Sequence, residues 1–183
     1  MNESVTGPTS PPEAGQTPSD SMVIWFSRTG STKVMADVVA GDFGSRKQLI
    51  EARKYTPDFS GMMRASWDTV GGIAGDIQPK QADFGTSKMI FLGSPIWWGG
   101  ISVPMLTLAE KCDFSGKDVV IFGTYNTGIN PAKVKAFQGL IEKRGGRFLD
   151  QIFIKVGLFK PLSAEEITAE TRAFLNTRRA GWK

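Results

Sequence analysis

Residues 22–40 read MVIWFSRTGSTKVMADVVA, and they contain the clearest indication of the fold class. Its first part, Met22–Phe26, is a continuous apolar run of the kind found in strands that are buried on both faces of a sheet. Over Thr32–Ala40, Val34 and Val38 recur at helical spacing, which predicts an amphipathic helix. A buried strand that leads through a short turn into a helix indicates an α/β fold.

The same alternation of strand and helix continues to the end of the chain. We expect further strands at Lys47–Ala52, Met89–Leu92, Val119–Phe122 and Phe148–Val156, and helices at Val103–Cys112, Pro131–Lys143 and Ser163–Arg178. Ser163 and Glu166 fit a capping box at the start of the last helix. Residues 53–83 are long for one crossover, so we expect a decorated connection with a short helix from Ser60 through Val70. The pattern predicts a mostly parallel sheet covered on both faces, with right-handed crossovers.

The chain of 183 residues suits one domain. Residues 1–21 are rich in Pro, Ser, Thr and Gly, so we expect a disordered tail there and a folded domain over residues 22–183. No apolar stretch is long enough to span a bilayer, and the tail has no apolar core like that of a secretory signal. We therefore expect a cytoplasmic protein, and an exported form whose signal has been removed stays open.

The composition restricts the chemistry. The chain has no histidine and one cysteine, Cys112, so it can form no internal disulfide, no dithiol redox pair and no Cys/His zinc site. We predict no metal site and no catalytic side chain, and any redox chemistry must belong to a cofactor. The formal net charge of +4 comes from Lys and Arg residues that are dispersed except in the tail Thr177–Lys183, which favours a solvated basic surface over a nucleic-acid partner.

The turn after Met22–Phe26 has the features of a phosphate site. A strand-to-helix turn directs free backbone N–H groups and the positive end of the helix dipole at one point. Gly30 can adopt positive φ, Arg28 adds charge nearby, and hydroxyl donors come from Ser27, Thr29, Ser31 and Thr32. The turn is neither a Walker A loop nor a Gly-x-Gly-x-x-Gly motif. The alternative interpretation is a Ser/Thr-rich helix N-cap that binds no ligand.

A further segment, Ser94-Pro95-Ile96-Trp97-Trp98-Gly99-Gly100, follows the expected strand at Met89–Leu92. Successive side chains point in different directions, so at most one of the two tryptophans should be inside, and the other is exposed or covers a ligand. The alternative is that both pack under the 53–83 connection. Taken with the phosphate site, this aromatic wall suggests a phosphorylated planar cofactor, with flavin mononucleotide (FMN) the leading candidate.

A third segment, Thr124-Tyr125-Asn126-Thr127-Gly128, follows the fourth expected strand. It supplies a second aromatic ring together with amide and hydroxyl groups for a polar ring edge. The position of this segment supports a binding role, because all three segments follow the carboxyl ends of strands in one expected sheet. Open α/β sheets bind ligands at that edge.

These segments resemble the flavodoxin family, which is itself a standard example of that binding rule. Residues 27–32 resemble the family's Ser/Thr-x-Thr-Gly-x-Thr phosphate loop, and residues 92–99 resemble the flavin loop of a branch with Pro-Ile-Trp-Trp-Gly. Phe114-Ser115-Gly116-Lys117 is similar to the family's approach to the third loop. The resemblance covers residues 22–178 and implies a flavodoxin-like three-layer sandwich, with a five-stranded parallel sheet of order 2-1-3-4-5.

The resemblance also implies the cofactor and its contacts. FMN would bind non-covalently, with its phosphate on residues 27–32, Trp97 or Trp98 on the isoalloxazine and Tyr125 on the other side. The Gly99–Gly100 region would hydrogen-bond the flavin N5. Redox partner proteins or a small-molecule electron acceptor would be the partners.

Two departures from the family pattern matter: the chain is basic, and its third loop holds no carboxylate. Negative charge near the flavin would oppose an anionic hydroquinone, so we predict a less negative hydroquinone potential than in the acidic carriers. Three functions remain open at this level. They are an electron-transfer protein, an FMN-dependent NAD(P)H:quinone-type reductase that uses the 53–83 segment, and a non-redox module on the same scaffold.

Overall fold

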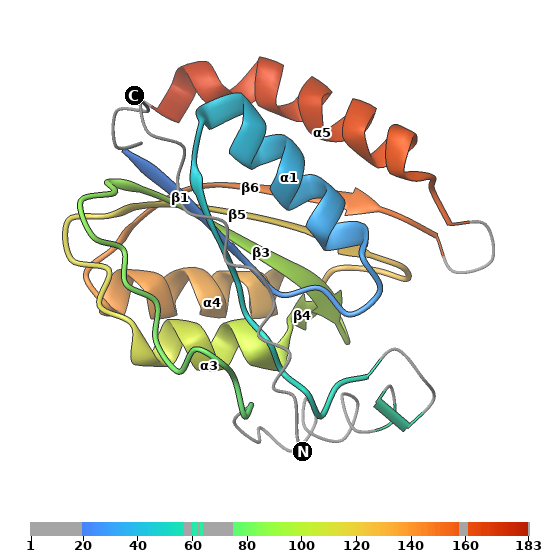
Figure 1. Ribbon diagram of the computed structural model, residues 1–183, viewed down its shortest axis with the longest axis horizontal. Coiled ribbons are helices and arrows are strands. Elements are labelled where there is room, and N and C mark those ends of the chain that lie inside the picture. The colour runs from blue at the N-terminus through green and yellow to red at the C-terminus, as the bar shows by residue number, and fades with distance from the viewer. Residues whose placement is uncertain (1–19, 57–59, 62, 64–74, 158–160, 183) are drawn as a thin grey trace, which may run out of the picture.

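A parallel sheet with helices on both faces organises the residues that the computed structural model describes, which are 20–56, 60–61, 63, 75–157 and 161–182 (Figure 1). Its five parallel strands follow the order β2-β1-β3-β5-β6. A short strand, β4, pairs antiparallel with β3 outside this path. The order is the expected 2-1-3-4-5 with one hairpin strand added, so the fold prediction is confirmed. The strands are β1 (Ser21–Trp25), β2 (Arg46–Leu49), β3 (Met89–Trp97), β4 (Gly100–Ile101), β5 (Asp118–Tyr125) and β6 (Arg147–Lys155).

Within the described part of the chain, four helices form the outer layers, two on each face of the sheet (Figure 1). On one side lie α1 (Ser31–Phe43) and α5 (Ala164–Arg178), and on the other lie α3 (Val103–Lys111) and α4 (Pro131–Lys143). A short 3-10 helix, η1 (Arg179–Trp182), follows α5. Ser163 caps α5 through the expected capping box with Glu166.

The core is divided by the sheet because alternate side chains of each strand face opposite layers. In β1, Met22 and Ile24 pack into the cluster under α3 and α4, whereas Val23 and Trp25 pack into the cluster under α1 and α5. All five residues of β1 are buried, as the continuous apolar run predicts.

The third strand differs from the expectation. The strand expected to end at Leu92 continues to Trp97, and a two-residue turn leads into β4. Gly93 and Pro95 are poor strand formers by themselves, but β3 pairs with β5 as far as Pro95, and this pairing overrides their local preference. Ile96 and Trp97 pair instead with β4. The second strand ends at Leu49 and not at Ala52, and Glu51 beyond it pairs with Gln78 in an isolated antiparallel bridge.

Two expectations fall mainly outside the described residues. Residues 1–19 of the expected tail are not described, and β1 begins at Ser21, one residue before the expected start. Most of the helix expected from Ser60 through Val70 also lies outside, at residues 62 and 64–70. Among the described helices, none has the length and apolar character needed to cross a bilayer.

Candidate functional site

A cavity of about 530 Å³ opens at the carboxyl ends of β1, β3, β5 and β6. The three expected segments all contribute to it, and the connection from β6 to α5 adds a fourth wall. The described lining residues are Arg28, Thr29, Ser31, Pro95, Ile96, Trp97, Thr124, Tyr125, Asn126, Val156, Gly157, Pro161 and Leu162. We call this cavity the main pocket.

The first wall is the turn before α1. Gly30 has φ 99° and is the residue that precedes the helix, and its backbone N–H donates to the Ser27 hydroxyl at 3.0 Å. No side chain of the described residues caps α1, in contrast to α4 and α5, which Asn130 and Ser163 cap. The N–H groups of the first turn of α1 therefore keep their hydrogen-bonding capacity for a ligand.

The four hydroxyls of this turn have different roles. Thr29 and Ser31 line the main pocket. The Ser27 hydroxyl closes the turn, and the buried Thr32 hydroxyl lies 3.1 Å from the Thr124 hydroxyl, which ties the first segment to the third. The N-cap interpretation thus accounts for part of the motif, since only two of the hydroxyls face the main pocket.

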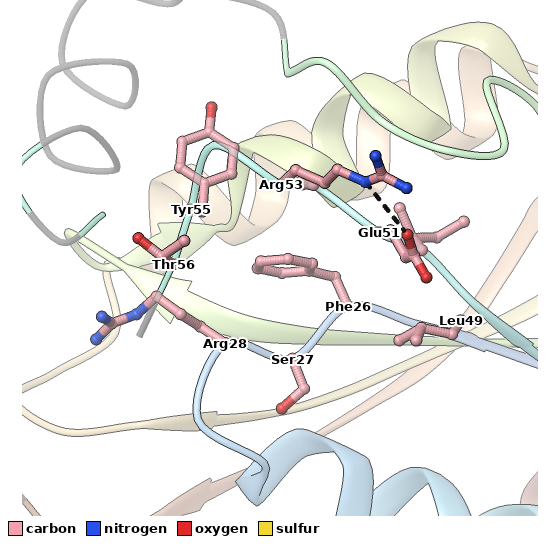
Figure 2. A pocket seen from close by; sticks show the side chains of 10 residues that line it. Phe26, Ser27, Arg28, Leu49, Glu51, Arg53, Tyr55 and Thr56 are labelled. Atoms are coloured by element: carbon pink, nitrogen blue, oxygen red, sulfur yellow. Dashed lines mark ion pairs between the residues drawn. The ribbon is translucent and has the colours of Figure 1, made fainter. Parts of the chain in front are cut away.

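Arg28 stands between the main pocket and a smaller cavity of about 250 Å³, and it lines both. Figure 2 shows the smaller cavity, where Phe26 and Tyr55 form an aromatic wall and the Arg28 side chain extends toward Thr56. In the same view the Ser27 side chain points toward α1, as its bond to Gly30 requires.

The two tryptophans are separated by the end of β3. Trp97 is half-buried and lines the main pocket, and its ring packs edge-on against Phe26 at 5.6 Å and Tyr55 at 5.2 Å between ring centroids. Trp98 is 64% exposed and is not among the described lining residues. One tryptophan is inside and the other outside, as expected. The alternative, in which both tryptophans pack under the 53–83 connection, holds for Trp97 alone, because its ring contacts Tyr55 of that connection.

The turn after Trp97 consists of Trp98 and Gly99, with φ values of 49° and 77°. Positive φ at both central residues is the requirement of a type I′ hairpin turn. The carbonyl of Gly99 accepts from the backbone N–H of Asn130 at 2.9 Å, and the carbonyl of Trp98 accepts from Lys133 Nζ at 2.8 Å. This side of the second segment faces α4, and neither Gly99 nor Gly100 is among the described lining residues.

Ser94 is also turned away from the main pocket. It is fully buried, its hydroxyl accepts from the backbone N–H of Ser102 at 3.0 Å, and the two serine hydroxyls lie 2.9 Å apart. These contacts connect β3 to the residue that precedes α3, so the role of Ser94 in this structure is to hold the fold.

The third segment supplies Thr124, Tyr125 and Asn126 to the main pocket, whereas Thr127 and Gly128 are exposed and outside the described lining.

The fourth wall was not expected from the sequence. Its residues are Val156, Gly157, Pro161 and Leu162, and their only sequence signal is that they follow a strand, the same rule that marked the other three segments.

The main pocket has a one-sided charge. None of its described lining residues carries a carboxylate, and Arg28 is the cation among them. A cavity with backbone donors at one end, an indole at its side and no anionic side chain among its described residues suits a planar molecule that carries a phosphate.

Comparison with known protein families gives a match that covers more than half of the chain. A family model described as Flavodoxin matches residues 20–138. No curated protein matches the sequence.

Three solved structures are among those similar to this chain. A candidate flavoprotein from Bacteroides uniformis is 24% identical over 83% of this chain and 97% of its own, with a TM-score of 0.64. One from Bacteroides eggerthii is 22% identical over 86% and 96%, with a TM-score of 0.63. A flavoprotein from Lactobacillus acidophilus, solved in complex with FMN, is 20% identical over 73% and 91%, with a TM-score of 0.59. At these identities the likeness concerns the fold.

Proposed function

This chain belongs to the flavodoxin family, and from that premise we propose that it binds FMN non-covalently in the main pocket and transfers electrons through the flavin. The observation that carries the proposal is the main pocket itself. Its volume of about 530 Å³ falls within the range of about 300–1,000 Å³ that is usual for cofactor sites. A protein of the same fold is described in complex with FMN, which supports the choice of cofactor.

The donor set at the start of α1 suits the phosphate. An uncapped helix N-terminus offers several N–H groups and a positive dipole end to a dianion, and the hydroxyls of Thr29 and Ser31 add to them. We propose that these groups bind the phosphate, with Ser27, Gly30 and Thr32 shaping the turn.

The opposite part of the main pocket suits a flat ring. We propose that Trp97 packs against the isoalloxazine and that Tyr125 borders it on another side. Asn126 offers an amide to the polar edge of the ring, and Gly157 lets the fourth connection pass close to it through a positive φ of 78°. Pro95 and Ile96 complete the wall beside Trp97.

FMN, when bound, would supply the reversible electron transfer, because the chain has one cysteine and can form no dithiol redox pair of its own. The protein then contributes binding, exclusion of water and the electrostatic setting. The electrons would pass to a redox partner protein or to a small-molecule acceptor.

The test is a visible spectrum and a titration of the full-length protein with FMN, with riboflavin as the matched ligand that lacks the phosphate. We expect a flavin band that remains with the protein during gel filtration, and much weaker binding of riboflavin. A protein that binds neither flavin would refute the proposal. Equal affinity for both flavins would refute the assignment of the phosphate to α1.

A second assay separates the two redox functions. Steady-state oxidation of NADPH in the presence of a quinone should be slow for an electron carrier and fast for a quinone-type reductase. We expect the slow result, because the sequence contains no nicotinamide-binding motif of the Gly-x-Gly-x-x-Gly kind.

A further inference from the structure

The turn between β3 and β4 is fastened to α4 by two hydrogen bonds. Lys133 Nζ donates to the carbonyl of Trp98 at 2.8 Å, and the backbone N–H of Asn130 donates to the carbonyl of Gly99 at 2.9 Å. Asn130 is itself fixed, because its side chain accepts from the N–H groups of Ala132 and Lys133 as the N-cap of α4. Both carbonyls of the turn are therefore attached to the first residues of one helix.

The turn needs such attachments because its conformation is unfavourable for its sequence. Trp98 has φ 49°, a region that bulky side chains rarely adopt. The residue is 64% exposed, so packing of its side chain does little to hold the backbone there. Gly99 lies close to the start of α4, since a Cβ added at this position would lie 3.0 Å from the Cβ of Asn130.

Besides its bond to the turn, Lys133 lies against Gly100 and borders a groove that Trp97 also lines. Its aliphatic stem lies against Gly100, where an added Cβ would come within 3.1 Å of the Lys133 Cδ. The same stem borders an apolar groove of about 240 Å³ whose lining includes Trp97, Ile101 and Phe137. Lys133 thus contacts the turn at Trp98 and the first residue of β4 at Gly100, and it shares the lining of this groove with Trp97.

We infer that Lys133 is a positioning residue of the main pocket. By donating to the Trp98 carbonyl, Lys133 holds the turn in its left-handed conformation. The turn then keeps the Trp97 side chain in the position where the cofactor packs against it. The inference rests on the proposed function for the identity of the ligand, but the attachment of the turn to α4 is independent of any ligand.

Three variants separate the hydrogen bond from the charge. Lys133→Met keeps most of the aliphatic stem and removes the donor, and Lys133→Arg keeps a cationic donor. Lys135→Met removes the same charge two residues further along α4, at an exposed side chain with no hydrogen bond or ion pair in the described part of the chain.

The first measurement is amide hydrogen exchange of Asn130 in the full-length protein, with and without FMN. Because the Asn130 N–H is bonded to the turn, we expect Lys133→Met to speed its exchange roughly fivefold, the effect of losing one charge-assisted hydrogen bond at an exposed site. Lys133→Arg and Lys135→Met should exchange like the wild type.

The second measurement is FMN affinity and the midpoint potential of the bound flavin, at low salt and at about 1 M salt, where the Debye length is about 3 Å. We expect Lys133→Met to weaken FMN binding roughly fivefold and to shift the potential at both salt concentrations. Lys133→Arg should restore both values, and Lys135→Met should match the wild type at high salt.

The outcomes are distinct. Equal exchange, affinity and potential in Lys133→Met and Lys135→Met would overturn the inference. Faster exchange without any change in affinity or potential would overturn the positioning role as well. If the wild type binds no FMN, the proposed function fails, whereas exchange at Asn130 still decides whether Lys133 holds the turn.

Discussion

Replacing Trp97 and Trp98 by leucine, one at a time, tests which tryptophan forms the wall of the main pocket. Trp97 makes two edge-on contacts, with Phe26 at 5.6 Å and Tyr55 at 5.2 Å. Since each aromatic pair contributes about 0.5–1.5 kcal/mol, Trp97→Leu should lower the free energy of unfolding by about 1–3 kcal/mol. Trp98 is 64% exposed, so Trp98→Leu should change it by less than about 0.5 kcal/mol.

The same pair of variants should differ in FMN affinity. Stacking of a flat heterocycle on an aromatic side chain is worth about 1–3 kcal/mol per ring. At about 1.4 kcal/mol for each factor of ten, Trp97→Leu should raise the Kd for FMN about 5- to 150-fold. Trp98→Leu should leave the Kd nearly unchanged, because Trp98 is outside the described lining of the main pocket. Residue 98 remains a bulky side chain in both variants, so the cost of its positive φ is similar in the two proteins.

The assays are urea unfolding followed by circular dichroism, and titration of FMN followed by quenching of flavin fluorescence. Unfolding in the absence of FMN measures how much the packing of the tryptophan contributes to stability. The titration measures how much its side chain contributes to FMN binding. The reasoning is refuted if Trp98→Leu loses as much FMN affinity as Trp97→Leu, or if Trp97→Leu binds FMN as tightly as the wild type.

Three further predictions concern the sheet, the pH dependence and the flavin. Gly123→Ala should destabilise the chain by about 3 kcal/mol, because its Cβ would collide with the backbone carbonyl of Ser94 in the neighbouring strand. Gly139→Ala, in open space on α4, should stabilise it by about 0.5–1 kcal/mol, and urea unfolding that ranks the two variants the other way would contradict this. The two hydrogen bonds from Arg147 lower the pKa of Asp118 in the folded state, so their contribution is present above the unfolded carboxyl pKa of about 3.9 and is lost as the pH falls through the folded value. Asp118→Asn should therefore cost about 0.5–1 kcal/mol at pH 7 and progressively less below about pH 3.9, and a cost that does not vary with pH would count against the ion pair. Because the described lining of the main pocket holds no carboxylate, a redox titration should give a hydroquinone potential less negative than that of acidic carriers, and a strongly negative second potential would exclude this explanation.

The order of strands and helices could be predicted because its signals are local. The apolar run at Met22–Phe26 indicated the buried central strand, and helical spacing after Thr32 indicated α1. The capping box of Ser163 and Glu166 marked the start of α5 correctly. Each of these signals involves residues within a few positions of one another, so a single sequence contains them completely.

The extension of β3 could not be predicted from the same kind of signal. Residues 93–97 contain a glycine and a proline, which favour a loop. The strand conformation of residues 93–95 depends on pairing with β5 about 30 positions along the chain, and residues 96–97 pair with β4. The contribution of the β6–α5 connection to the main pocket could not be predicted either. Its residues have no distinctive chemistry, and the position of the strand before them brings them to the site.

The candidate site was predicted as a set of segments, and the structure distinguishes the residues within each segment. Ser27, Thr32 and Ser94 are polar residues in ligand-like positions, yet the hydroxyl of each has a hydrogen-bond partner within the protein: Gly30 in the same turn, Thr124 and Ser102. Their assignment as direct cofactor contacts stays a prediction. Trp97 and Trp98 are identical in type and adjacent in the chain, and only the turn after β3 separates their surroundings.

Three features can be read from the sequence alone: the α/β fold, the carboxyl edge of the sheet as the place of the candidate site, and the lack of a dithiol redox pair. These follow from periodicity, from turn residues and from composition, which are properties of neighbouring residues or of the whole count. Three other features require the folded chain: which hydroxyls line the main pocket, which tryptophan lines it, and the hydrogen bond from Lys133 to the turn beside it. These three depend on contacts such as that of Thr32 with Thr124, 92 positions apart, and contacts over such separations are set by the packing of the whole chain and not by any local pattern.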